Sequence, residues 1–334
     1  ILHVLQHHSM DCDYMVGAQL EGFEVMVRIT DAAPVMVLEG DEYLTSPLDR
    51  RPKFHLYRPD IALISGIAWD HINVFPTFDQ YIDQFSIFAS LVTQNGTLIY
   101  CDEDPEVRKV GQAARPDIHA LPYGVPEHVV EDGVTSLLVN GGKHPLKVFG
   151  DHNLLNLNGA WLVCRELGLS DEQFLEAIAS FAGASKRLER VAEKAHTTIF
   201  KDSAHAPSKL VATTRAVKKQ FPDRQLVACI ELHTYSSLSE AFLSHYKGSL
   251  DDADVAMVYY SQHALQLKRL PDLSPEQVKA AFANPDLSVY TDSSKLRSGL
   301  LGIDWKDKNL LMMSSGNFDG VRVEDLAEEI LSGA

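Results

Sequence analysis

Residues 197–237 read TTIFKDSAHAPSKLVATTRAVKKQFPDRQLVACIELHTYSS and contain a strand–helix–strand pattern. An apolar run opens the stretch at 197–200, and a second apolar run, LVACIE, occupies 226–231. Between them, Pro207 is placed to open a helix, because proline is favoured at the first helical position. This order predicts a βαβ unit, in which the two strands lie parallel in one sheet.

The alternation continues to the end of the chain. Further apolar runs are DVAMVYY (254–260), LSVY (287–290) and NLLMMS (309–314). A helix between them is marked by SPEQVKAAFA, in which Ser274 is the expected N-cap and Gln277 follows three residues later. The pattern predicts an α/β fold with a doubly wound, mainly parallel sheet, whose ligand site lies at the carboxyl ends of the strands.

The first part of the chain has shorter strand-like runs. A helix is expected over 78–92, where Tyr81, Phe85 and Phe88 repeat at helical spacing. The segment 128–143 contains Asp-Gly and Gly-Gly turns and predicts an antiparallel ribbon. The expected strands are EVMVRI (24–29), PVMVLE (34–39), IALISGI (61–67), TLIYC (97–101) and PLKVF (145–149).

Charge divides the chain into two parts. The 334 residues carry a net charge of -16, and residues 1–185 hold 26 acids against 11 bases, whereas residues 186–334 hold 20 acids and 19 bases. This shift predicts a domain boundary between residues 185 and 186, and the acidic balance disfavours nucleic-acid binding. No apolar run is long enough to cross a membrane and the first residues lack signal-peptide features, so a cytoplasmic location is expected.

Acidic and imidazole side chains follow two strands of the first part. Glu39, Asp41 and Glu42 follow one predicted strand, and Asp70 and His71 follow another. A carboxylate and an imidazole near one sheet edge suit a divalent ion such as Mg²⁺ or Mn²⁺ that also holds phosphate oxygens. The alternative is a solvated acidic loop with His71 capping a turn.

A second polar group opens the helix that starts near residue 151. His152, Asn153 and Asn156 lie in its first turns, where free N–H groups and the helix dipole favour polar or anionic ligands. Amide groups match the donor and acceptor edge of a purine. The alternative is that Asp151 or Asn153 simply caps the helix.

The remaining candidates lie in the second part and near its start. Arg187 belongs to the basic segment SKRLER at the expected boundary, and an arginine there can stabilise charge in phosphoryl transfer or form an ordinary ion pair. The segments KDSAHAP, ELHTYSS and SSGNFDG each follow a predicted strand and are expected to line one crevice. The adjacent pair His7 and His8 is expected at the surface, and the four widely spaced cysteines are expected to be reduced thiols.

In order and spacing these segments resemble the Mur ligase family, the ATP-dependent amide-forming enzymes of peptidoglycan synthesis. The resemblance covers nearly the whole chain. Within the family, EGDEYLTSPLDRRPKFHLYRPD, WDHINVF and MSSGNFDG look most similar to the murein peptide ligase branch, which joins UDP-N-acetylmuramate to L-alanyl-γ-D-glutamyl-meso-diaminopimelate. The alternative within the family is addition of L-alanine to UDP-N-acetylmuramate. An alternative of another class is a nucleotide-binding module without catalysis.

The resemblance implies a partial central ATPase domain over residues 1–185, with a mainly parallel sheet. There Glu39 and His71 match the Mg²⁺ ligands of the family. His152, Asn153 and Asn156 match the HNxxN helix that contacts the adenine of ATP. The phosphate-binding loop and the UDP-binding domain of the family are expected upstream of Ile1.

For residues 186–334 the resemblance implies a Rossmann-like domain that binds the amine substrate. Arg187 matches an arginine that reaches the γ-phosphate, and Asp202 matches an aspartate that binds ribose. His205, His233 and Tyr235 fall in loops that meet the incoming amino acid or peptide. His233 stands where an arginine is usual, which leaves the partner of the substrate carboxylate open. A monomer or weak oligomer is expected.

Overall fold

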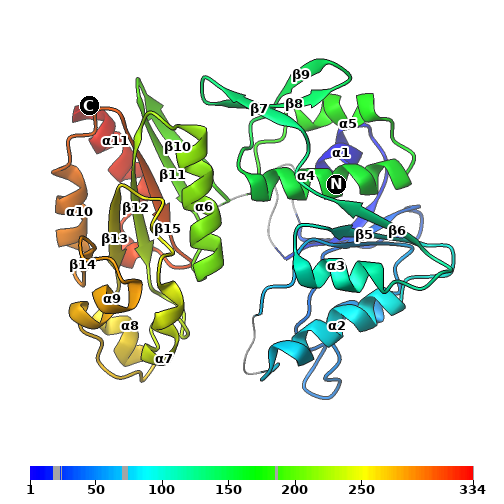
Figure 1. Ribbon diagram of the computed structural model, residues 1–334, viewed down its shortest axis with the longest axis horizontal. Coiled ribbons are helices and arrows are strands. Elements are labelled where there is room, and N and C mark those ends of the chain that lie inside the picture. Colours follow the sequence, from blue (N-terminus) through cyan, green and yellow to red (C-terminus); the bar gives the residue numbers. More distant parts are fainter. Residues whose placement is uncertain (18–22, 24, 70–73, 185–186, 334) are drawn as a thin grey trace. The chain divides into compact units, whose positions relative to one another are not determined.

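The computed structural model describes residues 1–17, 23, 25–69, 74–184 and 187–333. The chain forms two compact units, Ile1–Phe181 and Ala182–Ala334, named the N-terminal unit and the C-terminal unit (Figure 1). Each unit has its own sheets and its own buried core. The boundary predicted from charge, between residues 185 and 186, falls outside the described residues and stays a prediction.

The described residues of the N-terminal unit form three small sheets. Their strand orders are β2-β1-β3, β4-β5-β6 and β7-β8-β9. The sheet β4-β5-β6 is parallel, and β7-β8-β9 is the antiparallel ribbon that the turn signals predict. The strands are β1 Asp13–Met15, β2 Val27–Arg28, β3 Met36–Leu38, β4 Ile61–Ile64, β5 Thr97–Cys101, β6 His119–Tyr123, β7 His128–Glu131, β8 Val134–Val139 and β9 Gly142–Pro145.

Helix α4, Asp151–Glu166, lies between two parts of the core of the N-terminal unit. Val163 joins the cluster around β4 and β5, whereas Trp161 stacks on Phe174 of α5 with ring centroids 5.2 Å apart. Burial on both sides fixes α4 and therefore the direction of its first turn. The other helices of this unit are α1 Leu2–His7, η1 Lys53–Leu56, α2 Phe78–Ser90, α3 Pro105–Gln112 and α5 Asp171–Ile178.

One strand prediction in the N-terminal unit is wrong, and one strand was missed. The run 145–149 is not a strand, because β9 ends at Pro145 and the backbone then turns through Gly150, with φ 89°, into α4. Its apolar side chains, Val148 and Phe149 among them, are buried all the same. Strand β6 was missed because four of its five residues are at least partly exposed and one is Pro122, which is unfavourable inside strands.

The C-terminal unit is built on one six-stranded sheet with the order β10-β11-β15-β12-β13-β14. All pairs are parallel except β10 with β11, so the doubly wound, mainly parallel fold is confirmed. The antiparallel edge strand β10 was missed because its sequence, ERVAEK, is largely charged. The strands are β10 Glu189–Lys194, β11 Thr197–Asp202, β12 Gln225–Glu231, β13 Val255–Tyr259, β14 Ser288–Tyr290 and β15 Lys308–Met313.

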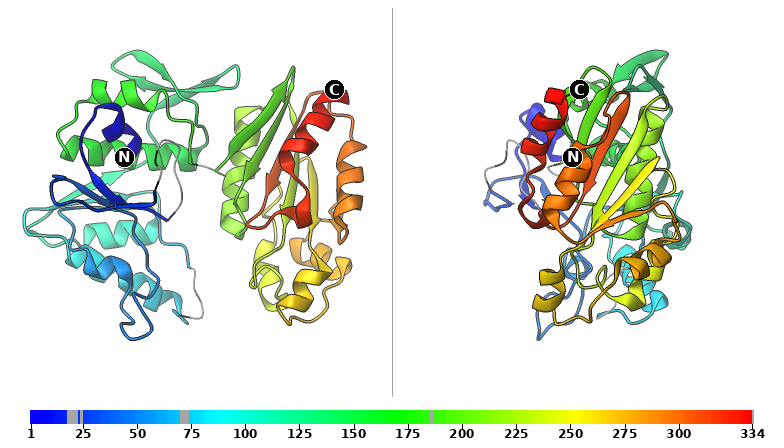
Figure 2. Two further views of the ribbon diagram at one scale, coloured as in Figure 1. Left: turned by 180° about the vertical axis from the view of Figure 1, so that it is seen from behind. Right: turned by 90° about the vertical axis from the view of Figure 1, so that its left-hand side faces the viewer.

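Helices cover both faces of this sheet. Helix α6 lies on one face, and α10 and α11 lie on the other (Figure 2). Alternate residues of β12 and β15, such as Cys229 and Met312, pack against α10 and α11, as expected for a strand buried on both faces. The helices are α6 Pro207–Gln220, α7 Glu240–Leu243, η2 Ser244–Tyr246, α8 Gln262–Leu267, α9 Pro275–Phe282, α10 Ser293–Leu301, η3 Phe318–Gly320 and α11 Val323–Gly333.

Several local predictions are confirmed. Ser274 caps α9 in a capping box with Gln277, and Pro207 is the first residue of α6. All four cysteines are buried free thiols. In the described part of the chain, no helix combines the length and the apolar character that crossing a bilayer requires.

Candidate functional site

Three loops of the C-terminal unit leave the same edge of its sheet. Strands β11, β15 and β12 are parallel neighbours, so the loops after Asp202, Met313 and Glu231 begin side by side. The backbone N–H of Ser314 donates to the carbonyl oxygen of Asp202 over 2.9 Å, which joins two of the loops. The three loops thus begin at one edge of the sheet, and that they line one crevice stays a prediction.

Glu231 is a buried carboxylate at the end of β12 that the sequence interpretation did not single out. Its side chain is only 3% exposed. One oxygen, Oε2, accepts hydrogen bonds from the hydroxyl of Ser314 and, over 2.8 Å, from the backbone N–H of Phe318. The signal was present, because Glu231 is the only charged residue in the run LVACIE and stands at the strand end where ligand sites form.

The loop held by Glu231 has an unfavourable backbone. Phe318, Asp319 and Gly320 have φ of 51°, 52° and 90° in succession. A non-glycine residue in this region costs about 1–2 kcal/mol, so the surrounding contacts must impose the conformation. The two hydrogen bonds to Glu231 are such contacts. Tyr259 donates to Asp319 over 3.5 Å, and burial, assisted by the carboxylates of Asp319 and Glu231, raises the pKa of Tyr259 to about 12.

His233 and Tyr235 lie in the loop after β12. The Nδ1 atom of His233 is 3.6 Å from Oε1 of Glu231, and its side chain is 40% exposed. A Cβ atom at Gly316 would lie 2.8 Å from both His233 and Glu231, so only glycine fits there. Tyr235 is 64% exposed. The buried carboxylate thus fixes one side of an imidazole whose other side faces solvent.

Asp202 lies at the end of β11 and is also buried, with 7% exposure. Its two oxygens accept the backbone N–H groups of Leu188 and Ala204, each over 2.6 Å. The side chain therefore ties the segment after Arg187 to the start of the loop that carries His205. Arg187 itself is exposed, and Nδ1 of His205 is 2.8 Å from the carbonyl oxygen of Ser203.

The polar residues at the start of α4 do not act as simple caps. The N-cap position is Gly150, without a side-chain cap. Asn153 donates from Nδ2 to the carbonyl oxygen of Phe149 over 2.9 Å, which orients its amide at the helix start. His152 is partly buried and Asn156 is exposed, so both can contribute to a surface at this end of the helix. The alternative, in which Asp151 or Asn153 is the N-cap of the helix, is not observed, because the N-cap is Gly150.

In the acidic loop, Glu39 differs from its neighbours. Asp41 accepts a hydrogen bond from Lys53 over 2.6 Å, and Glu42 accepts one from Tyr81 over 2.9 Å. Glu39 is exposed, and its Oε2 accepts the backbone N–H of Gly17 over 2.6 Å. Of these three carboxylates, Glu39 is the one that contacts the segment after β1, at Gly17.

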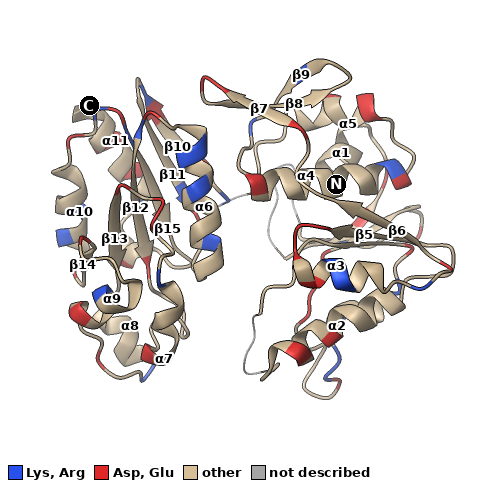
Figure 3. Cartoon of the chain, viewed as in Figure 1, with Lys and Arg blue, Asp and Glu red and all other residues tan. Residues whose placement is uncertain are grey.

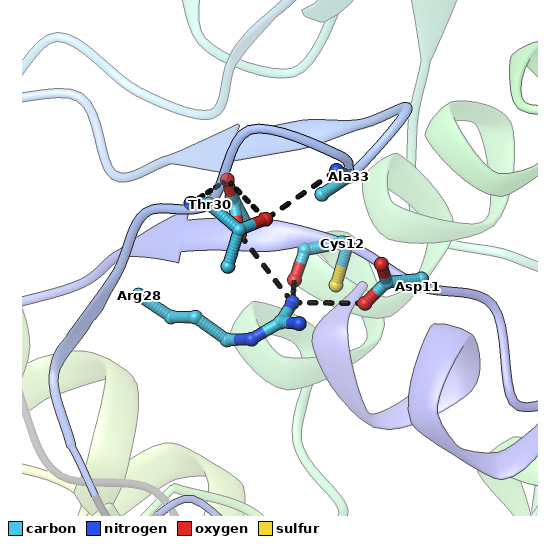
Figure 4. A network of polar contacts seen from close by, with 6 residues as sticks. Asp11, Cys12, Arg28, Thr30 and Ala33 are labelled. Atoms are coloured by element: carbon cyan, nitrogen blue, oxygen red, sulfur yellow. Dashed lines mark hydrogen bonds and ion pairs between the residues drawn. The ribbon is translucent and has the colours of Figure 1, made fainter.

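A network of polar contacts holds β1 in place (Figure 4). Asp13, 5% exposed, accepts the backbone N–H of Thr30 over 2.6 Å and its hydroxyl over 3.0 Å. Arg28 donates to the carbonyl oxygen of Cys12 over 2.5 Å and pairs with Asp11 over 2.9 Å. These contacts join β1 to the strand and loop beside it and so position the Glu39–Gly17 contact. The sequence interpretation did not identify them.

The argument that Glu39 and His71 follow strands of one sheet is wrong, because β3 and β4 belong to different three-stranded sheets. His71, Asp70 and Lys186 lie outside the described residues. Of the two residues expected to bind Mg²⁺, the structure therefore describes only the exposed carboxylate of Glu39. Carboxylate oxygens are hard ligands of the kind that Mg²⁺ takes in proteins. Glu39 fits this chemistry.

Charge differs between the units as the sequence predicts. In the C-terminal unit both signs are present, and the Lys and Arg residues of α6 are visible in blue in Figure 3. Many of the charges are paired locally; Lys218 of α6, for example, is 2.6 Å from Asp254. Such partly exposed pairs contribute little to stability and do not by themselves indicate a ligand.

Comparison with known families assigns one segment of the chain to a domain family. Residues 24–164 match the model of the Mur ligase middle domain. The matched segment includes Glu39 and the first turns of α4. Residues 24–164 are therefore assigned to a Mur ligase middle domain.

Its curated relatives include UDP-N-acetylmuramate–L-alanine ligases from three bacteria. The relative from Roseiflexus sp. (strain RS-1) is 28% identical over 73% of this chain and 56% of its own length. The relative from Roseiflexus castenholzii is 26% identical over 94% of this chain and 69% of its own length. The relative from Desulfitobacterium hafniense (strain Y51) is 30% identical over 66% of this chain and 51% of its own length. The chain thus spans between half and about two thirds of these relatives.

Solved structures with the same fold include members of both predicted branches. The UDP-N-acetylmuramate–alanine ligase of Thermotoga maritima matches 99% of this chain and 71% of its own, with 16% identity and a TM-score of 0.68. A murein peptide ligase from Psychrobacter arcticus matches 100% of this chain and 74% of its own, with 20% identity and a TM-score of 0.62. These likenesses confirm the fold class. They do not confirm a specific closeness to the murein peptide ligase branch.

Proposed function

We propose that this chain belongs to an ATP-dependent, ADP-forming ligase that joins the carboxylate of UDP-N-acetylmuramate to an amine. The observation that carries the proposal is the Mur ligase middle-domain match over residues 24–164, followed by a sheet whose strand-end loops gather polar side chains. A carboxylate needs activation before an amine attacks it, because oxide is a poor leaving group. Transfer of the γ-phosphoryl group of ATP supplies an acyl phosphate, and the amine then displaces phosphate.

In the N-terminal unit the proposed roles concern ATP and Mg²⁺. Glu39 and His71 would hold Mg²⁺, which when bound offsets the negative charge of the phosphates and the carboxylate. His152, Asn153 and Asn156 would contact adenine. The support for this is the orientation of the Asn153 amide at the start of α4 and the exposure of Asn156.

In the C-terminal unit the proposed roles concern the phosphoryl group and the amine. Arg187 would stabilise the transferring phosphoryl group, and its exposed position next to the anchored residue Leu188 suits a side chain that must reach a ligand. Asp202 would contact ribose in addition to holding the backbone. His205, His233 and Tyr235 would meet the amine substrate, and the exposed face of His233 supports this assignment.

L-alanine is the proposed amine. The curated relatives described above all carry the name UDP-N-acetylmuramate–L-alanine ligase, and they support this alternative better than the tripeptide. The second candidate is L-alanyl-γ-D-glutamyl-meso-diaminopimelate, favoured by the resemblance of the segments DRRPKF and SSGNFDG to the murein peptide ligase branch.

The test uses the complete gene product with ATP, Mg²⁺ and UDP-N-acetylmuramate, and measures phosphate release with L-alanine or with the tripeptide. Release that depends on L-alanine supports the first proposal, and release that depends only on the tripeptide supports the second. Release with neither amine contradicts the ligase and favours a non-catalytic nucleotide-binding protein. The assay depends on no assignment of a single residue.

The metal role is tested separately with His71→Ala. Loss of a ligand that stabilises transition-state charge is expected to lower kcat by on the order of 100-fold without unfolding the protein. His119→Ala, an exposed histidine on β6, is the matched control and is expected to keep wild-type turnover. Wild-type activity of His71→Ala would exclude the assigned role.

A further inference from the structure

Two histidines and a glutamate to which the proposed ligase activity assigns no role come together in the N-terminal unit. His7 and His8 lie at the end of α1, and Glu176 lies on α5, which packs beside α1 (Figure 1). One ligand atom from each side chain falls within 4.8 Å of the others, and Nε2 of His7 is 3.7 Å from Oε1 of Glu176. The sequence interpretation expected this histidine pair to be an ordinary surface feature, and nothing in the sequence joins it to Glu176.

The two imidazoles lie beside each other at the end of α1. Successive residues within a helix point in different directions. However, α1 ends at His7, and His8 is the C-cap with φ −95° and ψ 13°. The rings therefore approach edge to face, with centroids 4.9 Å apart.

The hydrogen bond of His8 fixes which nitrogen is free. Nε2 of His8 lies 2.8 Å from the carbonyl oxygen of Gln173, and because a carbonyl only accepts, Nε2 must carry the proton. In the neutral ring Nδ1 then holds a lone pair. A backbone carbonyl that accepts the second N–H is the usual support of a metal-binding histidine, since it fixes both ring orientation and tautomer.

We propose that His7, His8 and Glu176 form a site for a borderline divalent transition metal, represented by Zn²⁺, with water completing the coordination. Two imidazoles and one carboxylate favour Zn²⁺, Co²⁺, Ni²⁺ or Cu²⁺ over Mg²⁺ and Ca²⁺, which prefer oxygen ligands. In a tetrahedral zinc site the ligand atoms lie roughly 3.4 Å apart. The 3.7 Å separation of His7 and Glu176 is close to this value, and rotation of their exposed side chains closes the remaining distance.

The bound ion would connect α1 to α5. The two helices contribute Leu5 and Phe174 to one buried cluster, so the ion would stabilise a contact that already exists. An ion that binds only the folded chain raises its melting temperature. This site is independent of the proposed ligase activity and concerns residues to which that activity assigns no role.

The test measures Zn²⁺ binding to the untagged protein by competition with a chromophoric chelator, and the visible absorption of the Co²⁺ form. The expected result is one equivalent bound with micromolar affinity, a tetrahedral Co²⁺ spectrum, and a rise in melting temperature of about 5 °C at saturation. His7→Ala and Glu176→Gln are each expected to weaken binding at least tenfold. Glu172→Gln removes the same charge from the same helix and is expected to bind as wild type.

Two results would overturn the proposal. One is Zn²⁺ affinity no tighter than millimolar for the wild type. The other is affinity that Glu176→Gln leaves unchanged, which would assign the bound ion to other histidines of the chain. Neither result bears on phosphate release by the ligase, so the two proposals fail or stand separately.

Discussion

Replacing Glu231 by leucine tests whether the buried carboxylate holds the loop at the end of β15. The substitution removes the acceptor of the Ser314 hydroxyl and of the Phe318 backbone N–H, while leucine fills a similar volume. Each donor left without a partner costs about 1–3 kcal/mol, and relief of carboxylate burial offsets part of this. The net loss is expected to be about 2–4 kcal/mol. For a unit of this size, that lowers the melting temperature by about 5–10 °C.

The assay is differential scanning calorimetry of the whole chain, because its two units can unfold in separate transitions. Only the transition of the C-terminal unit is expected to shift. Glu328→Leu is the matched control, since Glu328 is exposed on α11, and it is expected to shift the transition by less than about 2 °C.

Glu231→Gln separates the hydrogen bonds from the charge. The amide oxygen can accept from both Ser314 and Phe318, so the expected loss is smaller, about 1 kcal/mol. If Glu231→Leu melts within about 2 °C of the wild type, the carboxylate does not impose the loop conformation and the reasoning is refuted. Equal losses of stability for Glu231→Leu and Glu231→Gln would instead show that the charge of Glu231, and not its hydrogen bonds, stabilises the loop.

Three further predictions concern packing, thiols and acid. Gly316→Ala places a Cβ atom 2.8 Å from Glu231 and His233 and is expected to lower the stability of the C-terminal unit by about 1–3 kcal/mol, measured by urea unfolding. Burial raises the pKa of the Cys229 thiol, so alkylation by iodoacetamide is expected only after unfolding, and rapid labelling of native protein would contradict this. Hydrogen bonding from Arg165, and also from Trp161, lowers the pKa of Asp171 below its ordinary value. Its stabilisation is therefore full above about pH 4 and lost as pH falls through the lower folded pKa, so Asp171→Asn is expected to lower the urea midpoint at pH 7 and to lower it by less as the pH falls below 4.

The strands that the sequence predicted well are those with continuous apolar runs. Strands β12, β13 and β15 are buried on both faces, and every position of LVACIE and most of DVAMVYY is buried. Such runs show in the sequence because both faces need apolar residues. Edge strands β6 and β10 were missed, because one-sided exposure permits charged residues and proline.

The candidate site was predictable where it follows strand order. Asp202, His233 and the SSGNFDG loop were expected at one edge, and the parallel order β11-β15-β12 brings their loops together. The hydrogen bonds of Glu231 were not predictable, because they join residues more than 80 positions apart along the chain.

The amino-acid sequence by itself determined the class of fold, since the period of apolar residues along each element decides which faces must be buried. It also indicated the resemblance to the Mur ligase family, through the order and spacing of EGDEY, HNLLN and SSGNFDG. Only the tertiary structure decided which polar groups meet. Glu231 with Phe318, Asp13 with Thr30, and Glu176 with His7 are pairs set by the packing of separate elements. Local sequence does not predict such pairs, because the partner that a buried polar group needs lies far away along the chain.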